Sequence, residues 1–267
     1  MGNGTSVQSV VGHRLAAILL SAIVLPIAAL SSSPARAAGA YAVDDSEIGK
    51  PGECKVESWA SFAGNRDVVG VVSPACVVNF IRPVELGAQL ARFRADGEWG
   101  TSLTLKGKIN LVPAETGKVG LGLGGGTTFD LITHENTGSF ISVPVTFPLS
   151  EEFKINVNGG WLYDRVASLH WVTWGAGFEW NFVKPLTLIG EVFGQAGHSV
   201  PAQPSLTDPR AQIGLRYTPV ESVDLDLIYG RNITGAGANW ITVGLNVRFG
   251  GAPEQPAEAK APRLIRK

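Results

Sequence analysis

The feature that most constrains this chain is a strict two-residue alternation of apolar and polar side chains after position 150. Every second residue from Phe153 to Tyr163 is apolar or glycine, and the pattern returns from Val172 to Phe182. A period of two is that of a β-strand. Each run is long enough for the roughly 9–11 residues that a tilted strand needs to cross a bilayer, whereas strands of soluble proteins average about five or six residues. The stretch from Phe153 to Trp180 therefore predicts a membrane hairpin.

The same alternation divides residues 55 to 249 into twelve strand-like segments separated by turn residues. The segments lie at approximately 55–63, 70–80, 84–94, 98–111, 117–131, 138–148, 152–163, 168–182, 186–196, 209–218, 222–231 and 238–249. No stretch in this part approaches the roughly 20 consecutive apolar residues of a spanning helix. A closed barrel is the other structure that pairs every backbone polar group in lipid. The predicted fold is therefore all-β, a single antiparallel transmembrane β-barrel of about twelve strands.

The two faces of these strands carry different side chains. The apolar set predicted to face lipid includes Leu103, Leu105, Ile109, Leu121, Leu123, Phe129, Ile213, Leu215, Tyr217, Leu225, Leu227, Tyr229, Ile241, Val243, Leu245 and Phe249. The polar set predicted to face the lumen includes Lys106, Lys108, Asn110, Lys154, Asn156, Glu179, Glu191, Gln195, Arg210, Gln212, Arg216, Asp224, Asp226, Asn246 and Arg248. A soluble barrel would invert this arrangement. Strand length, an export signal and aromatic residues near the strand ends favour lipid outside.

The N-terminal residues are typical of a secretory signal peptide. Arg14 supplies a positive charge, Leu15 to Leu30 an apolar run, and Ala35-Arg36-Ala37 a small-x-small cleavage site. An uncleaved transmembrane anchor is the alternative. The predicted organisation is a signal peptide at 1–37, a polar lead-in at 38–54, the barrel at 55–249 and a disordered periplasmic tail at 250–267.

The two cysteines bracket a predicted hairpin whose turn lies near Asn65. A turn centred on Asn65 would place Cys76 opposite Cys54, and one centred on Arg66 would place it opposite Val56. A cross-strand disulfide is therefore possible within the usual separation limits, and an exported chain favours it over two free thiols. The sequence has no CxxC motif and no His/Cys cluster at metal spacing, so we expect neither a metal nor another cofactor.

The last predicted strand, Ala238 to Phe249, ends on alternating apolar residues and a Phe, as bacterial outer-membrane barrels do. Gly160-Trp161-Leu162 and the runs 188–194 (LIGEVFG) and 212–219 (QIGLRYTP) are similar to a family of proteobacterial outer-membrane barrels. Members of that family are described as transporters or linked to the meta-pathway of phenol degradation. The resemblance implies export to the bacterial outer membrane of a Gram-negative cell, contact with its lipid and insertion by the barrel-assembly machinery. It implies no catalytic residue.

Signals for other classes of protein are weak. The net charge is −1 and basic residues are scattered, which argues against nucleic-acid binding. Residues 120–125 match GxGxxG, but another strand pattern follows where a dinucleotide fold needs a helix. Ser168 and His170 are two residues apart on a predicted strand, too far for a nucleophile and its base. We therefore expect no enzyme activity.

The candidate functional residues are charged side chains predicted to line the lumen. They are Glu179, Glu191, Arg216, Asp224, Asp226 and Arg248. Opposite charges on neighbouring strands attract, so we expect an ion-pair network, which either fills the lumen or forms a constriction that selects solutes. The predicted function is passage of an unidentified small molecule without covalent chemistry. The alternative is a plugged structural or surface-interaction barrel that acts through its extracellular loops, chiefly residues 197–208.

Overall fold

The computed structural model describes residues 40–95, 97–198, 206–207, 209–233 and 239–251. The predicted signal peptide lies outside the described residues, as does the predicted tail from residue 252 on. Both remain predictions. In the described ranges no helix is long and apolar enough to cross a membrane.

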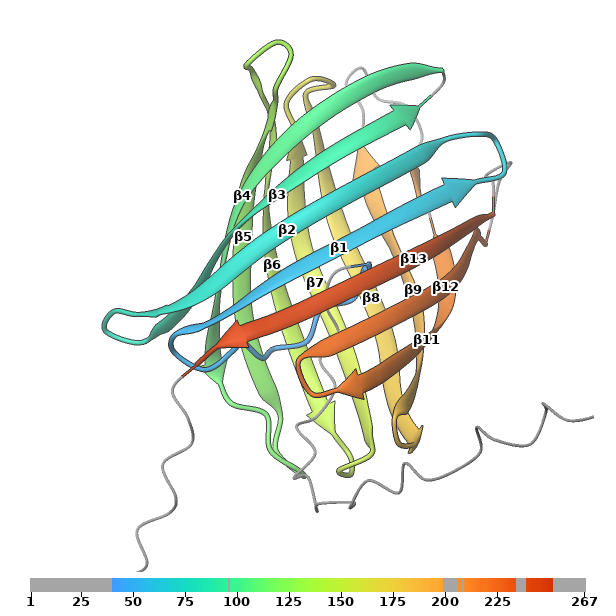
Figure 1. Cartoon of the computed structure of the whole chain (residues 1–267). Helices are drawn as coiled ribbons and strands as arrows, with labels where there is room; N and C mark the ends of the chain where they lie inside the picture. The colour runs from blue at the N-terminus through green and yellow to red at the C-terminus, as the bar shows by residue number, and fades with distance from the viewer. Residues whose placement is uncertain (1–39, 96, 199–205, 208, 234–238, 252–267) are drawn as a thin grey trace, which may run out of the picture. The chain divides into compact units, whose positions relative to one another are not determined.

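The described residues form an antiparallel β-sheet closed into a barrel (Figure 1). The strands are β1 (Glu53–Ala63), β2 (Val68–Asn79), β3 (Pro83–Ala95), β4 (Glu98–Val112), β5 (Gly120–Asp130), β6 (Asn136–Pro148), β7 (Phe153–Asp164), β8 (Leu169–Val183), β9 (Leu186–His198), β10 (Leu206–Thr207), β11 (Arg210–Val220), β12 (Val223–Asn232) and β13 (Trp240–Gly250). Twelve of these form the barrel wall, and β10 is a two-residue strand beside β9. The predicted fold class is confirmed.

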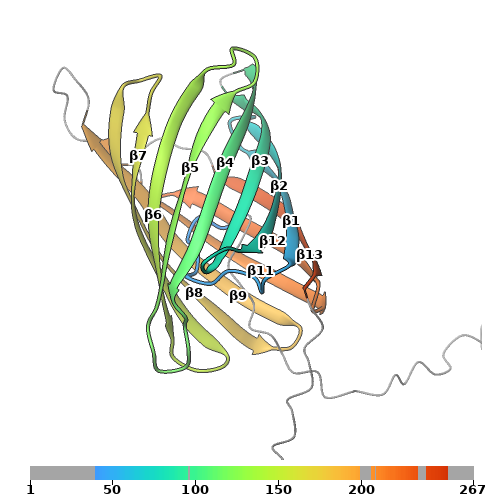
Figure 2. The same ribbon diagram turned by 90° about the vertical axis from the view of Figure 1, so that its left-hand side faces the viewer.

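Apart from β10, strands that follow one another along the chain are hydrogen-bonded neighbours in the wall. The barrel closes where β13 pairs with β1 (Figures 1 and 2). Closure leaves no long unpaired edge, which is the condition for a sheet in lipid. One detail differs from the sequence prediction. The connection predicted at 197–208 is shortened, because β9 extends to His198 and Leu206 pairs with Gly197.

Burial alternates along the strands as the sequence predicts. On β11 and β12, Leu215 and Leu227 are 40% and 58% exposed on the outer face, whereas Arg216 and Asp226 on the inner face are 0% and 4% exposed. The same alternation places Lys154 and Asn156 of β7 inside and Val157 outside. The apolar face is therefore the outer one, as membrane insertion requires.

A disulfide joins Cys54 on β1 to Cys76 on β2, with the two Cα atoms 4.0 Å apart. The register sets these two residues directly opposite each other, which is the arrangement predicted for a turn centred on Asn65. The alternative register, with Cys76 opposite Val56, is excluded because Val56 pairs with Pro74.

Candidate functional site

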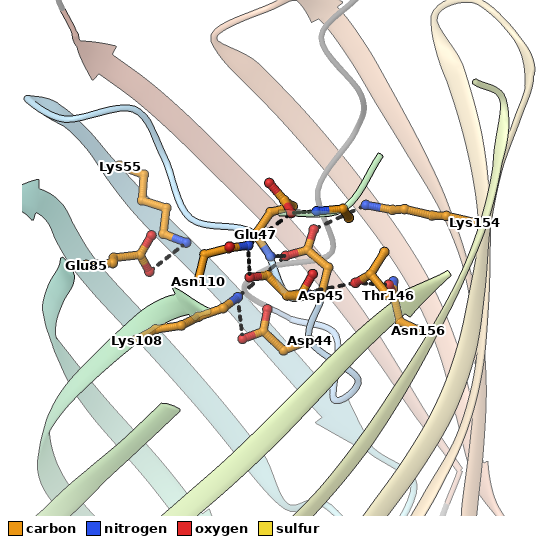
Figure 3. A network of polar contacts seen from close by, with 12 residues as sticks. Asp44, Asp45, Glu47, Lys55, Glu85, Lys108, Asn110, Thr146, Lys154 and Asn156 are labelled. Carbon is orange, nitrogen blue, oxygen red and sulfur yellow. Dashed lines mark hydrogen bonds and ion pairs between the residues drawn. The ribbon is translucent and has the colours of Figure 1, made fainter. Parts of the chain in front are cut away.

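The polar lead-in lies inside the barrel. Residues 40–52, which we call the lumenal segment, precede β1 and cross the lumen between two parts of its wall (Figure 3). The first residues contact β9, β11 and β12, and the later ones contact β4, β5 and β6. Strands β4 and β11 are six places apart in the twelve-strand order, so these two parts of the wall face each other. The sequence predicted the polarity of this segment but not its position.

The segment is anchored at one end by Tyr41. Its ring packs against Ile189 of β9 and Ile228 of β12, both 1% exposed on the inner face. Gly214 of β11 lies between these isoleucines, because it is the register partner of both. A Cβ atom at Gly214 would collide with the Tyr41 hydroxyl. The missing side chain thus creates an apolar slot that the tyrosine ring fills.

Arg216 covers the ring of Tyr41, with the guanidinium carbon 5.2 Å from the ring centroid. A cation over an aromatic face is attracted by the ring quadrupole. Burial, together with the nearby Asp226 carboxylate, raises the pKa of Tyr41 above its usual range, so the phenol stays neutral. The Tyr41 hydroxyl is buried and has no hydrogen-bond partner among the described residues. The ring therefore holds this end by packing and not by its hydroxyl.

Glu191 of β9 holds the backbone that follows Tyr41. Its carboxylate accepts hydrogen bonds from the backbone N–H groups of Ala42 at 3.0 Å and Val43 at 3.2 Å, and from Gln212 Nε2 at 2.7 Å. Val43 then packs against Gly175 of β8, where an added Cβ would lie 2.8 Å from Val43 Cγ2. Two glycines in the wall, at Gly175 and Gly214, thus allow the segment to approach closely.

The middle of the segment is held by ion pairs. Lys108 of β4 contacts Asp44 at 2.8 Å and Asp45 at 3.5 Å. Lys154 of β7 contacts Asp45 at 3.1 Å and Glu179 of β8 at 2.9 Å. Figure 3 shows the two lysines reaching the segment from different sides of the wall. The Asp45 side chain is only 1% exposed, so these charges are compensated inside the protein.

The later residues Ser46 and Glu47 are held, within the described part of the chain, by hydrogen bonds and not by ion pairs. Ser46 N–H donates to Thr146 Oγ1 at 2.8 Å, and Asn110 Nδ2 donates to the Ser46 carbonyl at 2.8 Å. The Glu47 carboxylate accepts from Asn110 at 3.1 Å and from the backbone N–H of Ala114 at 2.8 Å. These contacts fix the segment against β4 and β6 (Figure 3).

The residues predicted to line the lumen all face inward, but they form separate groups. Arg216 binds Asp226 through two hydrogen bonds, of 2.8 and 3.0 Å, and Arg248 binds Asp224 at 2.7 Å. The two pairs meet where Arg216 Nε lies 3.9 Å from Asp224 Oδ2. Glu179 instead pairs with Lys154, and Glu191 holds the lumenal segment. Whether these residues select solutes stays a prediction.

Sequence reasoning missed the slot, although a signal for it exists. Ile189 and Ile228 occupy inner-face positions on strands whose other inward residues include Glu191, Asp224 and Asp226. An apolar residue that interrupts a polar face needs an apolar partner, because water wets the rest of that face. Two such residues on nearby strands predict that something apolar docks between them.

The motifs of other protein classes have ordinary structural roles. Gly120 to Gly125 lie within β5, which pairs with β4 on one side and with β6 on the other. The His170 ring stacks on Tyr163 with ring centroids 4.8 Å apart, and on Trp161 at 5.7 Å, in an aromatic cluster on the outer face. The described residues contain no group of three or more His, Cys, Asp or Glu that could hold a metal ion.

The space left beside the segment is small. A polar cavity of about 20 Å³ lies between the segment and the wall formed by β1, β3, β4 and β13. Its lining includes Asp45, Glu47, Lys55, Glu57 and Glu85. Since a single water molecule needs about 10–15 Å³ measured in this way, the cavity holds at most a water or two. The segment is therefore closely packed against this side of the wall.

Residues 25–249 match the family described as "Uncharacterised conserved protein UCP029691". No curated protein matches the chain. Among solved structures, the KdgM porin has 10% identity and a TM-score of 0.56, with coverage of 73% of this chain and 99% of the porin. The COG4313 outer membrane channel from Pseudomonas putida F1 has 13% identity and a TM-score of 0.57, covering 77% of this chain and 98% of the channel. The NanC porin has 7% identity and a TM-score of 0.57, covering 72% and 98%. At these identities the likeness establishes a shared porin-like fold.

Proposed function

Since the chain belongs to this family, whose description states no activity, we propose from the geometry that it is an outer-membrane channel for small polar solutes, narrowed by its own lumenal segment. The observation that carries the proposal is a closed barrel with an apolar outside and a charged inside, crossed by residues 40–52. A charged lumen is wet, so polar solutes are the class that can enter it. Passage would be by diffusion, without a covalent step.

Three features support a location in the bacterial outer membrane. They are the predicted signal peptide, the apolar outer face of the barrel and the fold shared with porins and channels. Insertion would use the barrel-assembly machinery, as for other bacterial barrels whose last strand carries a Phe near its end, as β13 does at Phe249. One structure of similar fold is of the KdgM porin in complex with disordered oligogalacturonate, and the family that the sequence resembles is linked to phenol degradation without a defined solute. The solute is therefore open to experiment.

Single-channel recording in a planar bilayer tests the proposal. We expect discrete but small conductance steps from the purified full-length protein, because the segment crosses the lumen. A variant that lacks residues 41–48 should give steps several-fold larger. The variant Lys118→Gln, in the exposed turn between β4 and β5, is the matched control and should behave as the wild type does. A barrel that is inserted but silent in all three forms would overturn the channel function.

The alternative is a plugged barrel that acts through its outer loops. The close packing of the segment against β1, β3, β4 and β13 favours it, since the cavity of about 20 Å³ on that side admits no solute. Under this alternative, removing residues 41–48 would open the pore but leave the biological activity unchanged, whereas shortening the connection between β9 and β11 would abolish it. An enzyme is the weakest candidate, because Ser168 lies in the turn before β8 and the His170 ring stacks on Tyr163 and Trp161 in the outer aromatic cluster.

A further inference from the structure

The wall of the barrel contains two buried lysines whose charge balance depends on the lumenal segment. The side chains of Lys108 and Lys154 are 11% and 14% exposed. Both ion pairs that Lys108 makes among the described residues are with the segment, to Asp44 and Asp45. The register partner of Lys108 on β3 is Glu85, but Glu85 pairs with Lys55, at 3.1 Å. Without the segment, Lys108 would lose both of these ion pairs and would keep only the longer-range attraction of Glu85, which is in contact with Lys55.

A buried ammonium without a counter-ion is costly, so this position requires a carboxylate. In this structure the segment supplies it. Lys154 is different, because the wall provides Glu179 as a second partner at 2.9 Å. The chain Glu179–Asn156–Thr146, linked by hydrogen bonds of 2.8 and 2.9 Å, fixes the far side of the site. Lys154 is therefore held by the wall independently of the segment, whereas Lys108 makes both of its ion pairs with whichever carboxylates occupy the lumen.

We propose that Lys108 and Lys154 form an anion-binding site in the lumen, which Asp44 and Asp45 occupy as internal ligands and which small solutes with two carboxylates occupy in exchange. The inference rests on the proposed channel function and names its solute class. Two carboxylates are specified because Lys108 contacts both aspartates and Lys154 contacts Asp45. Asp44 is the natural point of entry, since its side chain is 43% exposed to the lumen while that of Asp45 is 1% exposed.

The exchange leaves the other end of the segment in place. Tyr41 lies in an apolar slot that a dicarboxylate does not fit, and Glu191 repels an anion. An arriving dicarboxylate would take over the lysines, and residues 44–47 would move away from β4 and β7. Asp44 and Asp45 then compete with the solute for the two lysines, and the tether gives them a high effective concentration at the site. The wild-type protein therefore binds solute weakly, and a variant without these two carboxylates binds it more tightly.

Calorimetry on the full-length protein folded in detergent tests this exchange with succinate as the probe and its uncharged diamide as the control. In the variant Asp44→Asn/Asp45→Asn the internal competitor is neutral, and we expect succinate to bind at least ten-fold more tightly than to the wild type. Adding Lys108→Gln and Lys154→Gln to that variant should abolish binding. Adding Lys118→Gln in its place should change nothing, because Lys118 lies in an exposed turn.

Equal succinate affinity with and without the two lysines would overturn the proposal, and so would tight binding of the diamide. If the double variant does not fold, Asp44→Asn alone serves, since Asp44 is the more exposed residue, and it should still strengthen binding several-fold. Calorimetry in detergent requires no conduction. Succinate binding by a silent barrel would therefore overturn the channel function alone, and conduction without succinate binding would overturn only the anion site.

Discussion

The N-terminal end and the middle of the lumenal segment are held by different interactions. Tyr41 is held by shape, in a slot made by Ile189, Gly214 and Ile228. The middle of the segment, at Asp44 and Asp45, is held by charge. Apolar burial is insensitive to salt and depends on the size of the side chain, whereas a lysine accepts any carboxylate of suitable position. The N-terminal end at Tyr41 is therefore an anchor, and the charged middle at Asp44 and Asp45 is a contact that can be exchanged.

Two proteases report separately on release of the anchor at Tyr41 and of the charged part of the segment. Chymotrypsin cleaves after Tyr41 and endoproteinase Glu-C after Glu47, and mass spectrometry identifies the site of each cut. A bond inside the lumen is protected until its part of the segment detaches from the wall and leaves the lumen, because a protease does not fit into the barrel. Rates of cleavage at these two positions therefore report release of the anchor and of the charged middle.

The largest effect is expected from Tyr41→Ala. Removing a buried aromatic side chain costs about 3–5 kcal/mol in protein cores, and the slot would remain as a cavity. We expect the whole segment to be released, with faster Glu-C cleavage at Glu47 and larger conductance steps. Tyr229→Ala is the matched control, since Tyr229 neighbours Ile228 on the outer face and is 46% exposed. Continued protection of Glu47 in Tyr41→Ala would contradict the anchor role.

Glu191→Gln should have the next largest effect. The carboxylate accepts two backbone N–H groups and the Gln212 amide, and hydrogen bonds to a charged group contribute about 1.5–3 kcal/mol. The amide of glutamine turns one acceptor into a donor, so one of these bonds is lost. Chymotrypsin should then cut after Tyr41 faster than in the wild type. Glu221→Gln, in the turn between β11 and β12, should leave this rate unchanged.

Tyr41→Phe tests whether the anchor is held by the ring alone. The hydroxyl is buried without a hydrogen-bond partner among the described residues, and such a group costs about 1–3 kcal/mol. Its removal should strengthen the docking, or at least not weaken it. The readout is slower Glu-C cleavage at Glu47 than in the wild type. Faster cleavage would mean that the hydroxyl makes a favourable interaction in the lumen.

The contrast between the anchor and the charged middle also explains which features the sequence could predict. Strands and faces follow from a period of two and from the lipid outside, which acts on every strand. The pair Arg216–Asp226 is predictable for the same reason, because these residues are register partners on neighbouring strands. Each of these inferences needs only local pattern and the order of strands. The same pattern puts Cys54 and Val56 on one face of β1, but only the structure shows that Cys76 lies opposite Cys54.

The position of the lumenal segment could not be predicted in this way. Residues 40–52 have no period, and their partners lie far along the chain, with Asp45 and Lys154 separated by 109 positions. Alternation shows that Lys108 and Lys154 face inward but not what they meet across the lumen. The two inward isoleucines, Ile189 and Ile228, were the sequence signal for this position, because they form an apolar site on the polar inner face that the Tyr41 ring fills.

The smallest effect is expected from salt, and it separates the anchor from the charged middle without a mutation. Raising the salt concentration from about 0.1 to about 1 M shortens the Debye length from roughly 10 to 3 Å. The pair between Lys108 and the half-exposed Asp44 should weaken, so Glu-C cleavage at Glu47 should rise modestly. Chymotrypsin cleavage after Tyr41 should stay constant, because salt does not weaken apolar burial. Equal responses at both positions would mean that the segment moves as one body, and the distinction between anchor and exchangeable contact would fail.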